Sequence, residues 1–195
     1  MSSAGEEGTG TTIMRLNEPI GWAALLIGLA LSGQPAQADQ EELFSLIAER
    51  LSWMEPVAAW KRVNDVPVED LDREAVVVDA AITDAAAHGL DPDTVRAFFE
   101  AQIEAAKAIQ DCWIDHWTAA NATPSNVPDL VSEIRPELLR LGNAIIAGLA
   151  EDIAQNGPIP SSADDDFRAA VSIECLDEHH ANALFDSLTQ VRIAE

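Results

Sequence analysis

Apolar residues recur at intervals of three and four positions along most of the chain beyond residue 40, which is the spacing of one helix face. The first such segment begins near Gln40 and carries Leu43, Leu46, Ile47 and Leu51. Pro56 interrupts the pattern, because proline has no backbone N–H to donate inside a helix. We therefore predict a first helix with a kink or a short break near Pro56, followed by helix over residues 57–63.

Start and stop residues divide the remaining chain into further helices. Asp91 and Pro92 suit an N-cap and a first helical residue, and Gly89 and Gly157 can end helices in the left-handed conformation. The predicted helices cover residues 69–88, 92–117, 129–156 and 162–191. Only Val76–Val78 forms a notable β-branched run. The pattern predicts an all-α helical bundle with an extra C-terminal helix and no internal repeat.

The first 38 residues have the features of a secretory signal peptide. Ile20–Ser32 is an apolar run of thirteen residues, preceded by Arg15 and followed by the small-residue segment Ala36–Ala38. The run is too short to span a bilayer comfortably. We predict cleavage after Ala38, which leaves residues 39–195 as one helical domain in the periplasm or outside the cell. The alternative is a buried N-terminal helix.

Export changes the interpretation of the two cysteines. Cys112 and Cys175 are the only cysteines in the chain. An even pair in an oxidising compartment favours one disulfide, here joining two helices. The alternative is a pair of buried free thiols.

The chain is short of positive charge, since 11 Lys and Arg stand against 34 Asp and Glu, and its net charge at pH 7 is −23. Nucleic acids and anionic membranes both require a basic face, so neither is an expected partner of the cleaved protein. A few cations at helical spacing among apolar residues predict a site for a small anion. Ion pairing to the many carboxylates is the alternative for any single arginine. The candidate residues are Arg50, Lys61, the segment Val68–Glu74, Gln110 and Arg135.

Five segments in this order carry a resemblance to a known family. They are Ala48–Leu51, Pro56–Lys61, Pro67–Glu74, Gln102–Gln110, and Asp129-Leu130 leading to Ile134-Arg135-Pro136. The series resembles the all-helical chorismate mutases over about residues 43–149. The signal peptide and the long C-terminal extension resemble the exported (gamma) subclass of that family. The resemblance implies a homodimer with each site inside one chain.

The resemblance implies conversion of the dianion chorismate to prephenate by a Claisen rearrangement, without a cofactor or metal. Catalysis then consists of holding the substrate in its reactive conformer and stabilising charge on the breaking ether oxygen. Guanidinium groups suit the two carboxylates of such a substrate. Two alternatives remain, an isochorismate-pyruvate lyase on the same fold and a secreted helical module that binds an anion or a partner without turnover.

The family pattern assigns roles to seven residues of this sequence. The carboxylates are bound by Arg50, Arg73 and Arg135. The ether oxygen accepts hydrogen bonds from Lys61 and Gln110, and the ring hydroxyl is bound by Asp70 and Glu74. Arg50 and Lys61 are eleven residues apart, or about three helical turns, so both can face one groove if Pro56 bends the segment mildly.

Some positions allow a second interpretation. Asp70 and Glu74 could be first-turn acids that the helix dipole favours. Lys107 is either a fifth cation of the substrate site or a partner for Glu104. Ala106 stands where family members often carry Ser or Thr, and the missing hydroxyl would weaken substrate binding by about 1 kcal/mol.

Other conspicuous residues have no predicted role in the site. The adjacent residues His179 and His180 point about 100° apart on a helix, which makes a shared metal ion improbable. The core is expected to include Trp53, Trp60, Trp113 and Trp117.

Overall fold

The computed structural model describes residues 35–195, with side chains from Gln40 onward. Its helices are α1 (Pro35–Ser52), α2 (Met54–Val63), α3 (Leu71–Ala87), α4 (Pro92–Ala119), η1 (Leu130–Ile134), α5 (Arg135–Asn156), η2 (Ser161–Ala163), α6 (Asp164–Ala170) and α7 (Glu178–Leu188). The all-α prediction is confirmed. Most of the predicted signal peptide, including Ile20–Ser32, lies outside the described residues. None of the helices within the described part is long and apolar enough to cross a membrane.

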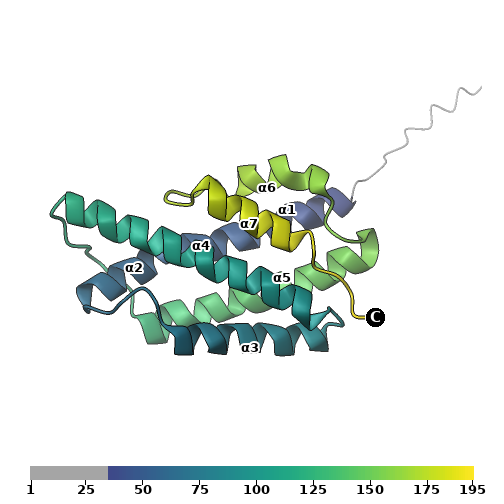
Figure 1. Ribbon diagram of the computed structural model, residues 1–195, viewed down its shortest axis with the longest axis horizontal. Helices are drawn as coiled ribbons and strands as arrows, with labels where there is room; N and C mark the ends of the chain where they lie inside the picture. Colours follow the sequence, from purple (N-terminus) through teal and green to yellow (C-terminus); the bar gives the residue numbers. More distant parts are fainter. Residues whose placement is uncertain (1–34) are drawn as a thin grey trace, which may run out of the picture. The chain divides into compact units, whose positions relative to one another are not determined.

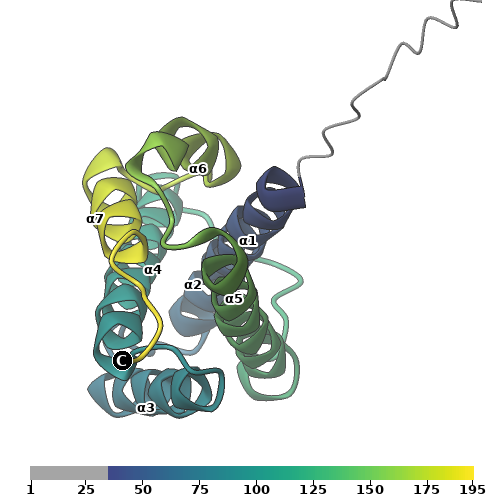
Figure 2. The same cartoon turned by 90° about the vertical axis from the view of Figure 1, so that its right-hand side faces the viewer.

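The longest helix, α4, organises the bundle. It packs against α2, α3 and α7, whereas α5 packs against α1 and α3. Figure 1 shows α3 running alongside the bundle, and in Figure 2 the same helix lies below α4 and α5. Helices α1, α2, α3, α4 and α5 therefore surround a common interior.

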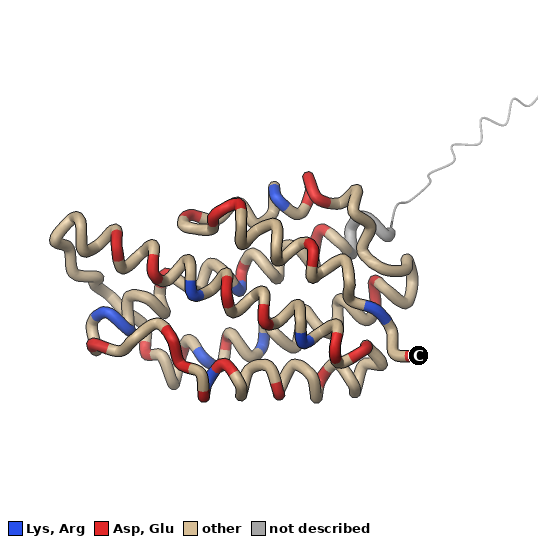
Figure 3. Tube along the Cα trace, in the orientation of Figure 1, with Lys and Arg blue, Asp and Glu red and all other residues tan. Residues whose placement is uncertain are grey.

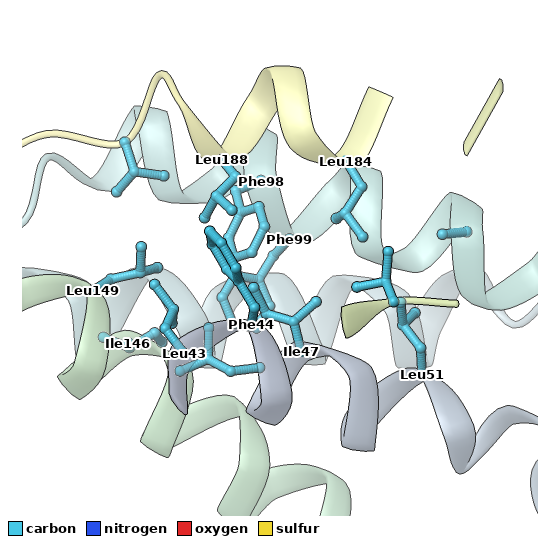
Figure 4. Packing of buried hydrophobic residues seen from close by; sticks show 14 of the residues in the cluster. Leu43, Phe44, Ile47, Leu51, Phe98, Phe99, Ile146, Leu149, Leu184 and Leu188 are labelled. Atoms are coloured by element: carbon cyan, nitrogen blue, oxygen red, sulfur yellow. The ribbon is translucent and has the colours of Figure 1, made fainter. Parts of the chain in front are cut away.

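The core forms where the apolar face of α1 meets α4, α5 and α7 (Figure 4). The side chains that meet there include Leu43, Phe44, Ile47 and Leu51 from α1, Phe98 and Phe99 from α4, Ile146 and Leu149 from α5, and Leu184 and Leu188 from α7. Each is at most 2% exposed. Burying each such side chain contributes roughly 1.5–3 kcal/mol, so the core holds α1 and α4 firmly in place.

The capping residues behave as the sequence predicted. The Asp91 side chain accepts a hydrogen bond from the Asp93 backbone N–H, and Pro92 is the first residue of α4. Gly89 and Gly157, which follow α3 and α5, have φ of +74° and +83°. Side chains are rarely compatible with this backbone region, which explains glycine at both positions.

The break near Pro56 lies three residues earlier than the proline itself. Helix α1 ends at Ser52, Trp53 forms a turn, and α2 begins at Met54. Pro56 thus falls in the first turn of α2, where no intrahelical N–H donor is needed. Arg50 and Lys61 consequently lie on opposite sides of this break in the chain.

The single helix predicted for residues 162–191 is wrong. The structure divides this segment into η2, α6 and α7, with a non-helical connection over residues 171–177. Cys175 in that connection has φ of +72°, which is incompatible with a continuous right-handed helix. A new start follows at once, because the Asp177 side chain accepts a hydrogen bond from the His180 backbone N–H.

The disulfide between Cys112 and Cys175 is confirmed, with the two Cα atoms 5.7 Å apart. Cys112 lies in α4, but Cys175 lies in the connection between α6 and α7 rather than in a helix. The bridge therefore fixes this connection, and with it α7, to the central helix.

Removing the disulfide should destabilise the fold strongly. A Cys112→Ala/Cys175→Ala variant should lose about 4 kcal/mol in free energy of unfolding, because the bridge closes a loop across a sequence separation of 63 residues. Urea denaturation of the variant and the parent measures the loss, and the reduced parent should match the variant. Unchanged midpoints, or two free thiols in the non-reduced parent, would contradict the prediction.

Candidate functional site

A cavity of about 530 Å³ opens between the N-terminal helices, α3, α4 and the start of α5. All nine residues predicted from the sequence for the substrate site line it: Arg50, Lys61, Asp70, Arg73, Glu74, Ala106, Lys107, Gln110 and Arg135. Five of the eleven lysines and arginines of the chain are among them. The scarce positive charge of this protein is concentrated at one place.

The surrounding charge is mostly negative, with acidic residues along the outer helices (Figure 3). Ion pairing to carboxylates was the alternative to anion binding for single arginines, and some cations outside the cavity do form such surface pairs. Arg140 pairs with Glu137 and Glu49, and Arg168 pairs with Asp164. Within the described residues, no such pair involves the four cavity cations Arg50, Lys61, Arg73 and Arg135. These cations remain available to an anionic ligand.

Arg50 is the most deeply buried cation of the cavity, at 5% exposed. Its guanidinium lies 5.8 Å from the centre of the Phe99 ring, within the range of a cation–π contact. Among the described residues, its Nε and Nη1 atoms have no hydrogen-bond acceptor. Burial lowers the pKa of Arg50 to about 10, so the side chain remains a cation at neutral pH. Arg50 therefore presents fixed donors to the cavity.

Lys61 is 9% exposed and comes from the other side of the break at Trp53. Its Nζ atom donates a hydrogen bond to the Val68 carbonyl at 2.5 Å. Burial lowers the pKa of Lys61, the carboxylates of Asp70 and Glu74 oppose that shift, and the net pKa lies below the usual value. An ammonium group has three donors, so the bond to Val68 leaves two for a ligand.

Arg73 and Arg135 are half-buried at the starts of α3 and α5. Burial lowers the pKa of Arg73, and the positive charge of Arg135 lowers it further. Cations are unfavourable at helix N-termini, where the dipole is positive. Because the two guanidiniums also repel one another, a carboxylate bound between them would relieve both costs.

Asp70 and Glu74 have a structural role and also face the cavity. The Asp70 side chain caps α3 by accepting the Arg73 backbone N–H at 3.1 Å. Glu74 Oε1 accepts the backbone N–H of Asp70 at 3.2 Å, which closes a reciprocal cap. The interpretation of these acids as helix-start residues is therefore correct, and it leaves both carboxylates on the cavity wall.

Gln110 is 4% exposed on the wall formed by α4. Its Nε2 atom donates to the Ala106 carbonyl at 2.9 Å and lies 3.6 Å from the sulfur of Met54. The second N–H thus meets only a weak acceptor. Ala106 offers only a methyl group to the cavity one turn before Gln110, so position 106 itself supplies no side-chain donor.

Lys107 differs from the other cavity cations because it contacts two carboxylates. Its Nζ atom lies 2.6 Å from Glu104 Oε1 and 3.5 Å from Glu74 Oε2. The hydrogen bond to Glu104 raises the pKa of Lys107, against a smaller lowering by burial. Lys107 thus combines both interpretations left open by the sequence, since it lines the cavity and contacts Glu104, whereas its contact with Glu74 was not predicted.

Several wall residues were missed from the sequence. Phe99, which lies under Arg50, is one of them. Val68 belongs to a predicted candidate segment, but the hydrogen bond from Lys61 to its carbonyl was not predicted. The spacing of residues 99, 103, 106 and 110, which places them on one face of α4, could have identified Phe99. Trp60, which was predicted to be core, is only half-buried and lines the cavity. The other three predicted core tryptophans, Trp53, Trp113 and Trp117, are also half-buried.

One group of potential metal ligands occurs in the described part of the chain, away from the cavity wall. It consists of Cys112, His116 and Cys175. Both sulfurs belong to the disulfide, so they are not available as thiolate ligands in this state.

Comparison with known proteins agrees with this arrangement. Residues 36–111 match the protein family described as chorismate mutase type II. A secreted chorismate mutase of Yersinia pestis is 30% identical over 165 residues, which cover 85% of this chain and 87% of the relative. A secreted chorismate mutase of Mycolicibacterium smegmatis is 34% identical over 140 residues, covering 69% and 75% of the two chains.

The fold leads to the same group of proteins. The crystal structure of secreted chorismate mutase from Yersinia pestis superposes with a TM-score of 0.71 at 27% identity, covering 78% of this chain and 98% of that one. The match to the family includes α1, α2, α3 and most of α4, which carry Arg50, Lys61 and Gln110. The chain therefore belongs to the type II chorismate mutase family.

Proposed function

We propose that this protein catalyses the rearrangement of chorismate to prephenate outside the cytoplasm, in the cavity lined by α1, α2, α3, α4 and α5. One C–O bond breaks and one C–C bond forms within the same molecule, and no proton or group leaves it. The enzyme has to hold a flexible dianion in its compact conformer and to stabilise negative charge on the ether oxygen as the bond breaks. Fixed cations and hydrogen-bond donors are sufficient for both tasks.

The proposed roles divide the cavity into three parts. The two substrate carboxylates are bound by Arg50, Arg73 and Arg135. Lys61 and Gln110 donate hydrogen bonds to the ether oxygen, and Lys61 also contacts a carboxylate. The ring hydroxyl is bound by Asp70 and Glu74. Ala106 supplies only apolar contact, at a cost of about 1 kcal/mol in binding relative to a hydroxyl side chain.

The observation that carries this proposal is the gathering of five cations around one cavity in a chain with a net charge of −23. Four of them have no carboxylate partner among the described residues. Burying cations in this way destabilises a fold unless an anion compensates them. A small dianion has the charge and the carboxylate geometry that these groups require.

Loss of chorismate absorbance on adding the purified protein tests the proposal. Prephenate should form without any added metal or cofactor. Incubation with isochorismate provides the necessary comparison, because formation of pyruvate and salicylate would indicate a lyase on the same fold. Tight binding of chorismate without turnover would indicate a binding module instead. Either of the last two outcomes would overturn the proposed reaction.

The location outside the cytoplasm is supported by the predicted signal peptide, and the Yersinia pestis and Mycolicibacterium smegmatis relatives are named as secreted proteins. We expect the mature protein to begin at Asp39. Cleavage there removes the first turn of α1, whose core contacts begin only at Leu43. N-terminal sequencing of protein from the periplasmic fraction measures the start. An Ala38→Asp variant should keep its leader, and a start at Met1 or Met14 in exported parent protein would contradict the prediction.

We further propose a homodimer in which each site lies within one chain. The support for a site within one chain is that all nine candidate residues of this chain line the same cavity. The exposed apolar side chain of Leu71, which is not part of the cavity lining, is a candidate for burial between the subunits.

A further inference from the structure

An ion pair between Lys107 of α4 and Glu74 of α3 lies at the cavity wall, and the proposed roles do not include it. Glu74 has both carboxylate oxygens engaged: Oε1 accepts the Asp70 backbone N–H at 3.2 Å, and Oε2 lies 3.5 Å from Lys107 Nζ. Lys107 in turn lies 2.6 Å from Glu104. The Glu74 carboxylate is therefore fixed from the backbone of its own helix on one side and from α4 on the other.

Glu74 borders two cavities, so its carboxylate needs a contact that holds it toward one of them. Glu74 lines the substrate cavity and also a second cavity of about 300 Å³ between α3 and α4. Arg96 lines only the second cavity, and within the described residues it forms no ion pair with Glu74. Lys107 lines only the first. A glutamate with open space on both sides needs a partner to hold it toward the substrate, and Lys107 stands where it can do so.

Lys107 is poorly placed to bind a carboxylate of the substrate. Its side chain is 20% exposed, and its ammonium group already faces two carboxylates. A substrate carboxylate at the same place would have to displace Glu74 or Glu104. The four other cavity cations have no such competitors among the described residues, so they are better receptors.

We propose that Lys107 is a positioning residue that acts through Glu74, holding its carboxylate toward the substrate cavity so that it accepts a hydrogen bond from the substrate's ring hydroxyl. This inference rests on the proposed function. Lys107 then influences how the ring hydroxyl is bound, and it does not act on the ether bond that breaks. Its removal therefore affects substrate binding more than the chemical step.

A double-mutant cycle between Lys107→Met and Glu74→Gln tests the proposal. Methionine keeps the length of the lysine stem without its charge, and glutamine keeps the shape of the glutamate. Each single variant should raise KM for chorismate about tenfold with kcat within about threefold, because a charge-assisted hydrogen bond to bound substrate is lost. The double variant should be no worse than Glu74→Gln alone, since Lys107 acts through Glu74.

The conservative Lys107→Arg variant should restore most of the lost affinity. Arg96→Met is the matched control: it removes one cation from the same helix, but outside the substrate cavity, and KM should stay near that of the parent. A chorismate analogue without the ring hydroxyl should bind the parent and Lys107→Met equally well. Circular dichroism and thermal melting of each variant establish that the fold is retained.

The possible failures are distinguishable. Additive effects of the two substitutions in an active enzyme would mean that Lys107 contacts the substrate directly, which overturns this inference and leaves the proposed reaction intact. An unchanged KM for Lys107→Met would overturn it as well. A folded parent protein without mutase activity would overturn the proposed function together with the inference.

Discussion

The Lys61→Ala variant should lose about a thousandfold in kcat, because a buried cation directed at developing negative charge contributes several kcal/mol to transition-state stabilisation. The geometry supports a large effect. Lys61 is 9% exposed, it is held by the Val68 carbonyl, and it lines the cavity. Solvent cannot replace these donors effectively at a buried position. The loss should therefore appear in kcat rather than in KM alone.

Two comparisons make the Lys61 result specific. Arg62→Ala removes the next cation along α2, but Arg62 donates to the Thr118 hydroxyl and the Ala122 carbonyl instead of facing the cavity. Its kcat should remain close to that of the parent. Circular dichroism should show unchanged helicity in both variants. A Lys61→Ala enzyme within tenfold of the parent in kcat would remove Lys61 from the proposed mechanism.

The lowered pKa of Lys61 also predicts the alkaline limb of the pH profile. Lys61 is active as a cation, and the cation is lost as the pH rises through its pKa. Because burial lowers that pKa, kcat/KM of the parent should fall at a lower pH than an exposed lysine would give. The activity should be roughly flat from mildly acidic to mildly alkaline pH below that limb.

The Gln110→Glu variant should convert this flat profile into one that falls steeply with rising pH. An amide donates a hydrogen bond at every pH, whereas a carboxyl group donates only while protonated. Once the new carboxylate ionises, an anion faces the negative charge that develops on the ether oxygen. We expect near-parental activity at low pH and a loss of about a hundredfold or more above the pKa of the introduced group.

Gln110→Met separates the loss of the donor from the gain of a charge. Methionine has a similar length and no N–H, so its activity should be low at all pH values, with the profile otherwise like that of the parent. Measurements of kcat/KM across pH for the three proteins are sufficient. A Gln110→Glu profile parallel to that of the parent would mean that residue 110 does not contact the ether oxygen, and this face of α4 would lose its proposed role.

Local chemistry explains what the sequence by itself determined. Helix starts at Asp70 and Asp91 and stops at Gly89 depend on hydrogen bonds and backbone angles within a few residues, so their signals are complete in the sequence. Cys112 and Cys175 are the only cysteines, so a disulfide within the chain could join only these two residues. The scarcity of cations singled out the basic residues of the cavity, and the family resemblance added Gln110, Asp70 and Glu74.

Tertiary packing decided the features that depend on distant segments. The sequence carries apolar periodicity through the last predicted helix, yet Cys175 adopts a positive φ in the bridge to Cys112, and the helix is divided there. Lys107 had Glu104 as a visible neighbour along its own helix, but Glu74 lies on α3 and becomes its partner only when α3 packs against α4. Helical periodicity defines which face a residue occupies, whereas the partner opposite that face depends on contacts between helices that no local pattern encodes.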